Sequence, residues 1–144
     1  MNNSAKISRP EVLKILCILT FIGSGLSILS NIVMFLSIDI IRELYTNGSF
    51  EFMLESLDGE TFEILIMTNR SYFGFQILGL AGAIFGAYKM WNLKKIGFHI
   101  YTISQIILII LTQIFLPDLP FPFFEVMISL VFITIYARSL KVMN

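Results

Sequence analysis

The sequence contains few charged residues and almost no cysteine or histidine. Only 14% of its 144 residues are Asp, Glu, Lys or Arg, too few to cover the surface of a soluble domain of this size. Cys17 and His99 each stand alone, which excludes an intrachain disulfide, a cysteine metal cluster and a bis-histidine haem. The formal net charge is zero, which does not favour nucleic acid as a partner. We therefore expect no cofactor, no metal site and no nucleic-acid binding.

Hydrophobic residues dominate the chain instead, at 56% of the total with a mean hydropathy of +0.82. Three of four apolar runs reach the ~20 residues that a helix needs to cross a bilayer, and the last is slightly shorter. The first run continues to Ile38 without a polar cleavage region, which favours a retained anchor over a cleaved signal peptide. The sequence predicts an all-α polytopic membrane protein. It is a single membrane domain, 1–144, with a bundle of four transmembrane helices at 12–38, 72–91, 96–116 and 121–137.

The connections between these runs differ in length. Short turns are expected at 92–95 and 117–120, and a short tail at 138–144, whereas 39–71 forms a long outer loop. Helical periodicity continues past Ile38 to a stop at Asn47-Gly48. Two more apolar stripes at helical spacing follow: Phe50, Met53, Leu54 and Leu57, then Phe62, Leu65 and Ile66. The outer loop is therefore predicted to be partly helical.

The charged residues are sorted along the chain. Eight of the ten basic residues flank the same ends of the apolar runs: Lys6, Arg9, Lys14, Lys89, Lys94, Lys95, Arg138 and Lys141. The positive-inside rule then places both termini in the cytoplasm of a multi-pass protein of the cell membrane. All acidic residues except Glu11 fall on the opposite side, so the outer loop and the rest of the outer face are predicted to be acidic.

Small residues mark one face of the second apolar run. Gly79, Gly82 and Gly86 recur at heptad spacing, and such faces allow helices to approach closely in lipid. The first run carries a comparable face of small polar residues: Thr20, Ser24, Ser27 and Asn31. We expect the two faces to pack together. The alternative use of the glycine face is self-association into a homo-oligomer.

Each apolar run also contributes a polar residue at a similar depth below the outer boundary. These residues form a predicted polar layer of Asn31, Gln76, Gln113 and Ser129, with Arg70 and Glu125 above it at the rim. Because unsatisfied polar groups are costly in hydrocarbon, they are expected to face inward and meet. They form either a hydrogen-bonded network that fixes helix register, which we favour, or an outward-open vestibule for a cation or small polar ligand. An ion pair between Arg70 and Glu125 is also predicted.

His99 follows Lys94 and Lys95 by about one turn, which places it near the cytoplasmic boundary. A histidine in a membrane protein can relay protons or bind a metal. No second histidine or nearby acid accompanies this one on that side. An interfacial packing role is therefore favoured.

Three segments resemble small bacterial four-helix integral membrane proteins of uncharacterised function: the Arg9-Pro10 opening, 16–25 and 90–101. The resemblance implies a four-helix membrane fold and carries no activity with it. Small multidrug transporters, disulfide-forming oxidoreductases and claudins are different. They need, respectively, a membrane-embedded glutamate in the first helix, cysteine pairs, and a Trp and Cys signature in the first outer loop, and this sequence has none of these.

No nucleophile, metal cluster or acid–base pair can be assembled from these residues, so we expect no enzymatic activity. The favoured function is a non-enzymatic accessory or interaction subunit in the lipid bilayer, which contacts a protein partner through the outer loop 39–71. The alternative is a small transporter or ligand-binding protein that uses the polar layer. A water-accessible cavity that reaches this layer would favour the alternative.

Overall fold

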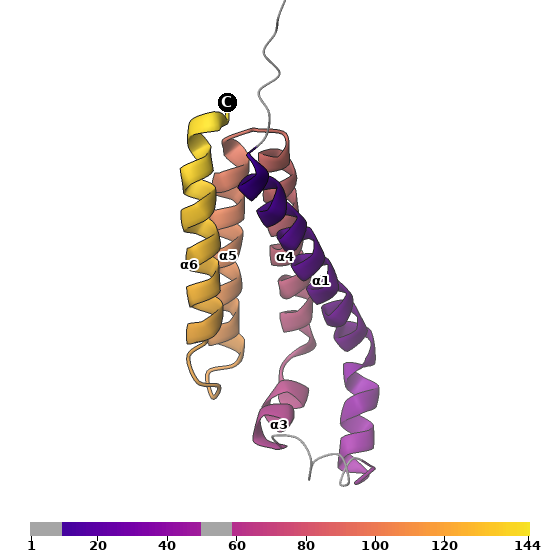
Figure 1. The fold of residues 1–144 in the computed structure, drawn as a ribbon. Helices are drawn as coiled ribbons and strands as arrows, with labels where there is room; N and C mark the ends of the chain where they lie inside the picture. The colour runs from indigo at the N-terminus through magenta and orange to yellow at the C-terminus, as the bar shows by residue number, and fades with distance from the viewer. Residues whose placement is uncertain (1–9, 50–58) are drawn as a thin grey trace, which may run out of the picture.

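The computed structural model describes residues 10–49 and 59–144, and all regular structure in these ranges is helical (Figure 1). Within these ranges four helices, the last counted together with η1, are long and apolar enough to cross a membrane, as the sequence predicted. The elements in chain order are α1 (Glu11–Thr46), α3 (Gly59–Met67), α4 (Arg70–Trp91), α5 (Ile96–Phe115), α6 (Phe123–Ser139) and the 3-10 helix η1 (Leu140–Val142).

α1 continues well beyond the predicted membrane span and ends where Asn47-Gly48 predicted. Gly48 adopts a φ of 73°, the left-handed conformation that glycine accepts without steric cost. The amides of Gly48 and Ser49 then bond the carbonyls of Tyr45 and Leu44, both at 3.1 Å. This pair of bonds satisfies carbonyls at the helix end and forms a Schellman stop.

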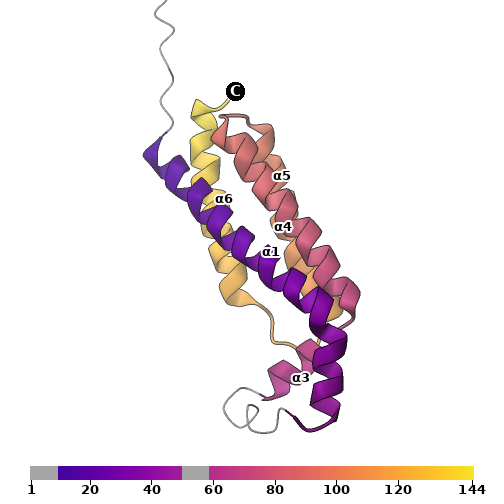
Figure 2. The same ribbon diagram turned by 90° about the vertical axis from the view of Figure 1, so that its right-hand side faces the viewer.

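α3 lies at the end of the bundle away from the C-terminus, beside the last turns of α1 (Figure 1, Figure 2). It contains the predicted stripe of Phe62, Leu65 and Ile66, and Ile66 is completely buried. The other predicted stripe, at 50–57, lies outside the described residues. The part of the long connection that the structure describes is therefore helical at both ends.

α4 and α5 form a hairpin that is closely packed along the glycine face of α4. A Cβ atom on Gly86 would lie 2.6 Å from the backbone nitrogen of Tyr101, and one on Gly79 or Gly82 would meet Leu108 or Ser104 of α5. The predicted packing of this face against α1 is therefore wrong. Because α5 already covers the glycine face, the face is not free for self-association either. The short turn between α4 and α5 holds these helices side by side, so the close backbone contact forms between α4 and α5.

In the described part of the chain, buried apolar residues form two separate clusters. The basic-end cluster lies near the α4–α5 turn and joins α1, α4, α5 and α6 through Leu13, Cys17, Ala87, Tyr101 and Tyr136, among others. The acidic-end cluster lies near α3 and consists of Ile38, Tyr72, Phe73 and Leu116, with partly buried neighbours. We call the end of the molecule at the α4–α5 turn the basic end, and the end at α3 the acidic end. α6 contributes buried side chains only to the basic-end cluster among the residues described.

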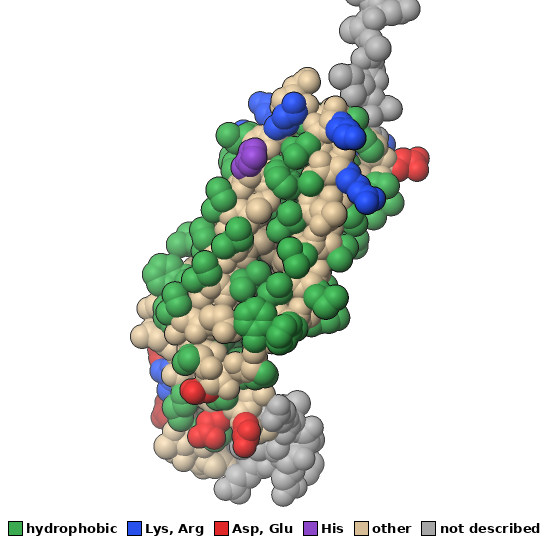
Figure 3. All heavy atoms as spheres, turned by 90° about the vertical axis from the view of Figure 1, so that its left-hand side faces the viewer, with side chains coloured by type: hydrophobic (Ala, Val, Ile, Leu, Met, Phe, Trp, Pro, Cys, Tyr) green, Lys and Arg blue, Asp and Glu red, His purple; other side chains and the backbone are tan. Residues whose placement is uncertain are grey.

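The surface between the two ends is apolar. In Figure 3, most Lys and Arg side chains lie at the basic end, most Asp and Glu side chains lie at the acidic end, and hydrophobic side chains are spread over the surface between them. Large apolar residues such as Leu26, Leu78 and Ile114 are each more than 60% exposed. A belt of this kind is the surface that lipid solvates, so the fold fits a multi-pass membrane protein.

The last residues pack back onto the α4–α5 turn. The amide of Asn144 donates to the carbonyl of Leu93 at 2.8 Å, and its carbonyl accepts from the amide of Lys95 at 2.9 Å. Met143 is buried beside this contact, in the basic-end cluster. These bonds fix the end of the described chain against the basic end.

Candidate functional site

A cavity of about 570 Å³ lies between α1, α4, α5 and α6. It borders both buried clusters, because Tyr101 of the basic-end cluster and Tyr72 and Leu116 of the acidic-end cluster belong to its lining. The space between the two halves of the core is therefore hollow at the depth where the sequence places its polar layer.

Each wall of the cavity is one face of a helix, with residues three or four apart. α6 contributes Glu125, Ile128, Ser129 and Phe132 in order of depth from the acidic end. The polar face of α1 forms the opposite wall: Thr20, Gly23, Ser24, Ser27 and Asn31. The small polar residues of α1 thus line the cavity, and the glycine face of α4 packs against α5 instead.

Four of the six residues predicted for the polar layer and its rim line this cavity. They come from three helices: Asn31, Gln76, Glu125 and Ser129. The other two, Gln113 and Arg70, are not among the lining residues. The depth pattern in the sequence therefore located most of one site, although the two exceptions need separate explanations.

The hydrogen bonds of the layer connect pairs of helices. The amide of Gln76 on α4 donates to Tyr72 Oη at 3.0 Å and to Thr112 Oγ1 of α5 at 3.3 Å. Ser129 of α6 donates to Gln105 Oε1 of α5 at 3.1 Å. Asn31 donates to a carbonyl of its own helix, that of Ser27, at 2.8 Å. These bonds tie α4 and α6 to α5, whereas the bond of Asn31 stays within α1.

Gln113 illustrates how narrowly a helix face is defined. The preceding residue, Thr112, lies on the cavity wall. Successive side chains of an α-helix point in directions about 100° apart, so Gln113 points away from that wall. Gln113 Nε2 is buried with no hydrogen-bond partner among the described residues, and so is Thr102 Oγ1 three turns earlier. Sequence reasoning missed Tyr72, Gln105 and Thr112, although Tyr72 precedes Gln76 by one turn and Gln105 precedes Thr112 by two.

The basic end of the cavity is closed by a contact between α1, α5 and α6. Thr20 Oγ1 and Tyr136 Oη lie 2.9 Å apart in a hydrogen bond, and the ring of Tyr101 meets that of Tyr136 edge-on at 5.0 Å between centroids. Below them Cys17 Sγ lies 3.6 Å from the carbonyl oxygen of Ala87. These buried side chains form a floor under the cavity.

α1 and α6 diverge from this floor toward the acidic end (Figure 1). Glu125 lies on the α6 wall at that end and is exposed. The cavity therefore has packed side chains at its basic end and the exposed carboxylate of Glu125 at its acidic end, which we call its mouth.

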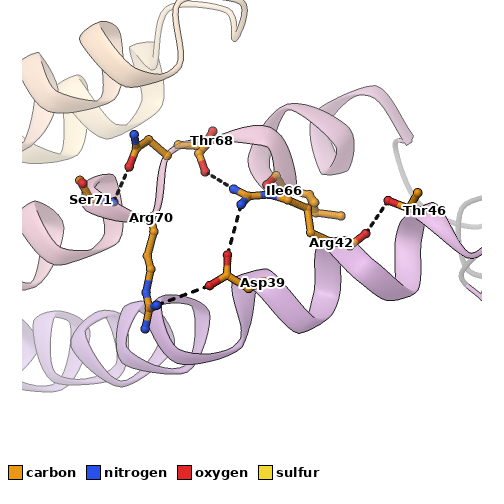
Figure 4. Close-up of polar contacts among 8 residues, drawn as sticks. Asp39, Arg42, Thr46, Ile66, Thr68, Arg70 and Ser71 are labelled. Carbon is orange, nitrogen blue, oxygen red and sulfur yellow. Dashed lines mark hydrogen bonds and ion pairs between the residues drawn. The ribbon is translucent and has the colours of Figure 1, made fainter.

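Arg70 belongs to a different contact, in which Asp39 joins two arginines (Figure 4). Arg70 Nη1 lies 3.4 Å from Asp39 Oδ2, and its guanidinium stacks 4.4 Å above the ring of Phe35. Arg42 Nη1 lies 3.3 Å from the other carboxylate oxygen of Asp39. The predicted Arg70–Glu125 ion pair is therefore wrong, because the start of α4 packs against α1 and not against α6.

Arg42 also holds the end of α3. Its Nε donates to the carbonyl of Ile66 and its Nη2 to the carbonyl of Thr68, both at 2.9 Å (Figure 4). The contacts of Asp39, Arg42 and Arg70, which we call the arginine clamp, fix α3 and the start of α4 onto the extension of α1. The sequence placed all three residues near the boundary but did not indicate their pairing.

A second hollow of about 550 Å³ lies at the acidic end, between α3 and the start of the α5–α6 connection. Glu60, Glu63 and Asp118 are among its lining residues. Within the described ranges, no three His, Cys, Asp or Glu side chains come together as a metal site would require. This hollow therefore carries negative charge, but its described residues do not form a group of ligands that could hold a metal ion.

His99 is exposed near the lysines of the basic end (Figure 3). Its ring lies edge-on to that of Phe98, with 5.6 Å between the ring centroids. His99 therefore lies near the basic end and does not line the cavity.

Comparison of the chain with known protein families, with curated protein sequences and with solved structures gave no match. Its function is therefore inferred from the cavity.

Proposed function

We propose that this chain is a non-enzymatic, multi-pass protein of the cell membrane that binds a small ligand in the cavity between α1, α4, α5 and α6. The observation that carries the proposal is a cavity of about 570 Å³ at the predicted polar layer. Small-molecule sites are concave spaces of about 300–1,000 Å³ with apolar walls and a few placed polar groups. Leu80, Leu108 and Ile109 supply such walls beside Gln76 and Ser129.

The ligand enters from outside the cell in this proposal. Lys89, Lys94, Lys95, Arg138 and Lys141 cluster at the basic end, so the positive-inside rule places that end in the cytoplasm. The mouth of the cavity at Glu125 then faces outward. This arrangement supports the ligand-binding function over the accessory function that composition alone favoured.

The test is cysteine labelling from outside in a Cys17→Ala background. Single cysteines replace Asn31, Gln76 or Ser129, and each is exposed to a hydrophilic, membrane-impermeant maleimide. All three should react, because each side chain lines the cavity. Gln113→Cys is the matched control, since it lies at a similar depth but away from the cavity, and it should stay protected.

A Glu43→Cys variant on the exposed extension of α1 reports that the reagent reaches the acidic end. Reaction at Glu43→Cys with protection at all three cavity positions would contradict the proposal and leave a sealed bundle. Equal reaction at Gln113→Cys would also contradict it, because labelling would then not follow the cavity.

One observation favours the second candidate, an interaction subunit. The arginine clamp fixes α3 in place, so the exposed Glu60 and Glu63 are held on a defined surface of the 39–71 segment. A basic protein partner at that surface fits this charge. Glu60→Lys together with Glu63→Lys should abolish its copurification while the cavity cysteines keep their reactivity.

A further inference from the structure

The charge of the cavity lining limits what the cavity accepts. Among the described residues that line it, Glu125 is the only one with a formal charge. No ion pair within the described ranges involves Glu125, and the two arginines of this end, Arg42 and Arg70, both contact Asp39. A carboxylate without a neutralising partner at the mouth of a largely apolar cavity attracts cations and repels anions.

The deeper lining is suited to an apolar body. Tyr72, Tyr101 and Phe132 place aromatic rings on three different walls, and leucine and isoleucine side chains fill much of the space between them. Aromatic faces attract cations within about 6 Å of the ring centroid, most strongly when the cation is poorly hydrated. Calcium sites in proteins commonly use several carboxylates, whereas Glu125 is the single carboxylate among the described residues of this lining.

The surroundings of the mouth have the same sign of charge. Asp39, Glu43, Glu60, Glu63, Asp118 and Glu125 lie in the described part of the acidic end, against two arginines. A surface of one sign concentrates oppositely charged ligands near a cleft. Long-range attraction and the local carboxylate thus act in the same direction.

We infer that the cavity binds a lipophilic organic monocation, whose charge is held by the carboxylate of Glu125 and whose apolar groups lie among the aromatic and aliphatic walls. This inference rests on the proposed ligand-binding function and adds the chemical class of the ligand.

The first experiment compares two probes of the same shape and opposite charge, tetraphenylphosphonium and tetraphenylborate. The purified full chain with Ser129→Cys in the Cys17→Ala background is labelled in detergent with the hydrophilic maleimide. Tetraphenylphosphonium should slow labelling of Ser129→Cys, and tetraphenylborate should not. Glu43→Cys on the exposed extension should label at the same rate with either probe.

The second experiment removes the charge. Glu125→Gln keeps the size of the side chain and should weaken tetraphenylphosphonium binding about tenfold, equivalent to about 1.4 kcal/mol. Glu43→Gln removes the same charge from an exposed residue at the acidic end, outside the cavity lining. The affinity of this variant for tetraphenylphosphonium should stay within about a factor of two of that of the parent.

The outcomes separate this inference from the proposed function. If both ions slow the labelling of Ser129→Cys equally, the inference is overturned and the cavity binds a ligand of another class. The same holds if Glu125→Gln and the parent bind tetraphenylphosphonium with equal affinity. A Ser129→Cys that never reacts would overturn the proposed function itself. The two-probe comparison uses chains that retain Glu125, so it remains decisive even if Glu125→Gln does not fold.

Discussion

Arg42 shows how one side chain can organise a boundary segment. α3 is short, and the carbonyls in the last turn of a helix have no partner within it. The guanidinium of Arg42 reaches two carbonyls at this end, those of Ile66 and Thr68, while it also contacts Asp39. Its positive charge is also favourable at the C-terminal end of a helix dipole. Only a planar, multi-donor group makes all three contacts from one position.

We expect Arg42→Ala to lower the free energy of unfolding by about 1.5–3 kcal/mol, because hydrogen bonds from a charged donor are lost and buried carbonyls are left unpaired. Arg42→Lys should recover only part of the loss, since an ammonium group lacks the fork geometry. Denaturant titration of the purified chain in detergent measures both. Arg138→Ala removes an exposed arginine at the opposite end, and equal stability of the Arg42→Ala and Arg138→Ala variants would contradict the assignment.

At the scale of single residues, the sequence predicts the depth of a side chain in the bundle better than its direction or its partner. The depth of Asn31, Gln76 and Ser129 could be counted along their helices, and all three line the cavity. Gln113 could be placed at the right depth but not at the right angle, because its orientation depends on how α5 rotates against α4. The partner of Arg70 could not be predicted, since Asp39 and Glu125 are equally near the boundary in the sequence.

At the scale of elements, Gly86 and Gly97 set the spacing between α4 and α5. A Cβ on Gly86 would lie 2.6 Å from the nitrogen of Tyr101 and 2.8 Å from the carbonyl oxygen of Gly97. Both contacts are with backbone, so no side chain can rotate away to make room. The hairpin therefore cannot accommodate an added methyl group without separating its two helices.

Gly86→Ala should accordingly destabilise the protein by about 1–3 kcal/mol, the usual cost of overpacking. Gly25→Ala on α1 is the matched control, because its Cβ would meet nothing within 4 Å. There the gain in helix propensity, up to about 1 kcal/mol, should leave stability equal or higher. Unfolding in detergent compares the two, and a Gly86→Ala variant as stable as Gly25→Ala would show that the hairpin is not closely packed.

Apolar length and end signals were sufficient to predict the elements. The runs at 72–91 and 96–116 agree with α4 and α5 to within two residues, and the stop of α1 follows from Asn47-Gly48. The pairing of faces was not predictable in the same way. Glycines indicate that some helix approaches closely, but the identity of that helix depends on the short turn at 92–95, which keeps α5 beside α4.

At the scale of the whole molecule, the orientation can be tested with two exposed positions. Glu43→Cys at the acidic end should react with an impermeant maleimide in intact cells, and Lys141→Cys at the basic end should react only after permeabilisation. Both variants carry Cys17→Ala, so one reactive thiol is present in each. The reverse pattern would turn the mouth of the cavity toward the cytoplasm.

The cavity itself is a property of the whole molecule that no single run of sequence specifies. Its floor is set where Thr20 meets Tyr136, and its walls come from four helices, of which α1 and α6 diverge from that floor (Figure 1). Residues at 20 and 136 are far apart along the chain, and neither carries a signal that names the other. The residues of the polar layer could therefore be predicted from the sequence, but the cavity beside them could not.

The division of the buried core into two clusters has a consequence for biosynthesis. A membrane chain is made from its N-terminus, so α1, α4 and α5 emerge from the ribosome before α6. The first three already share both clusters, whereas α6 adds buried side chains only at the basic end within the described chain. We therefore expect the nascent protein to hold three walls of the cavity together before α6 arrives. The arrival of α6 would then place Tyr136 on the floor and Glu125 at the mouth.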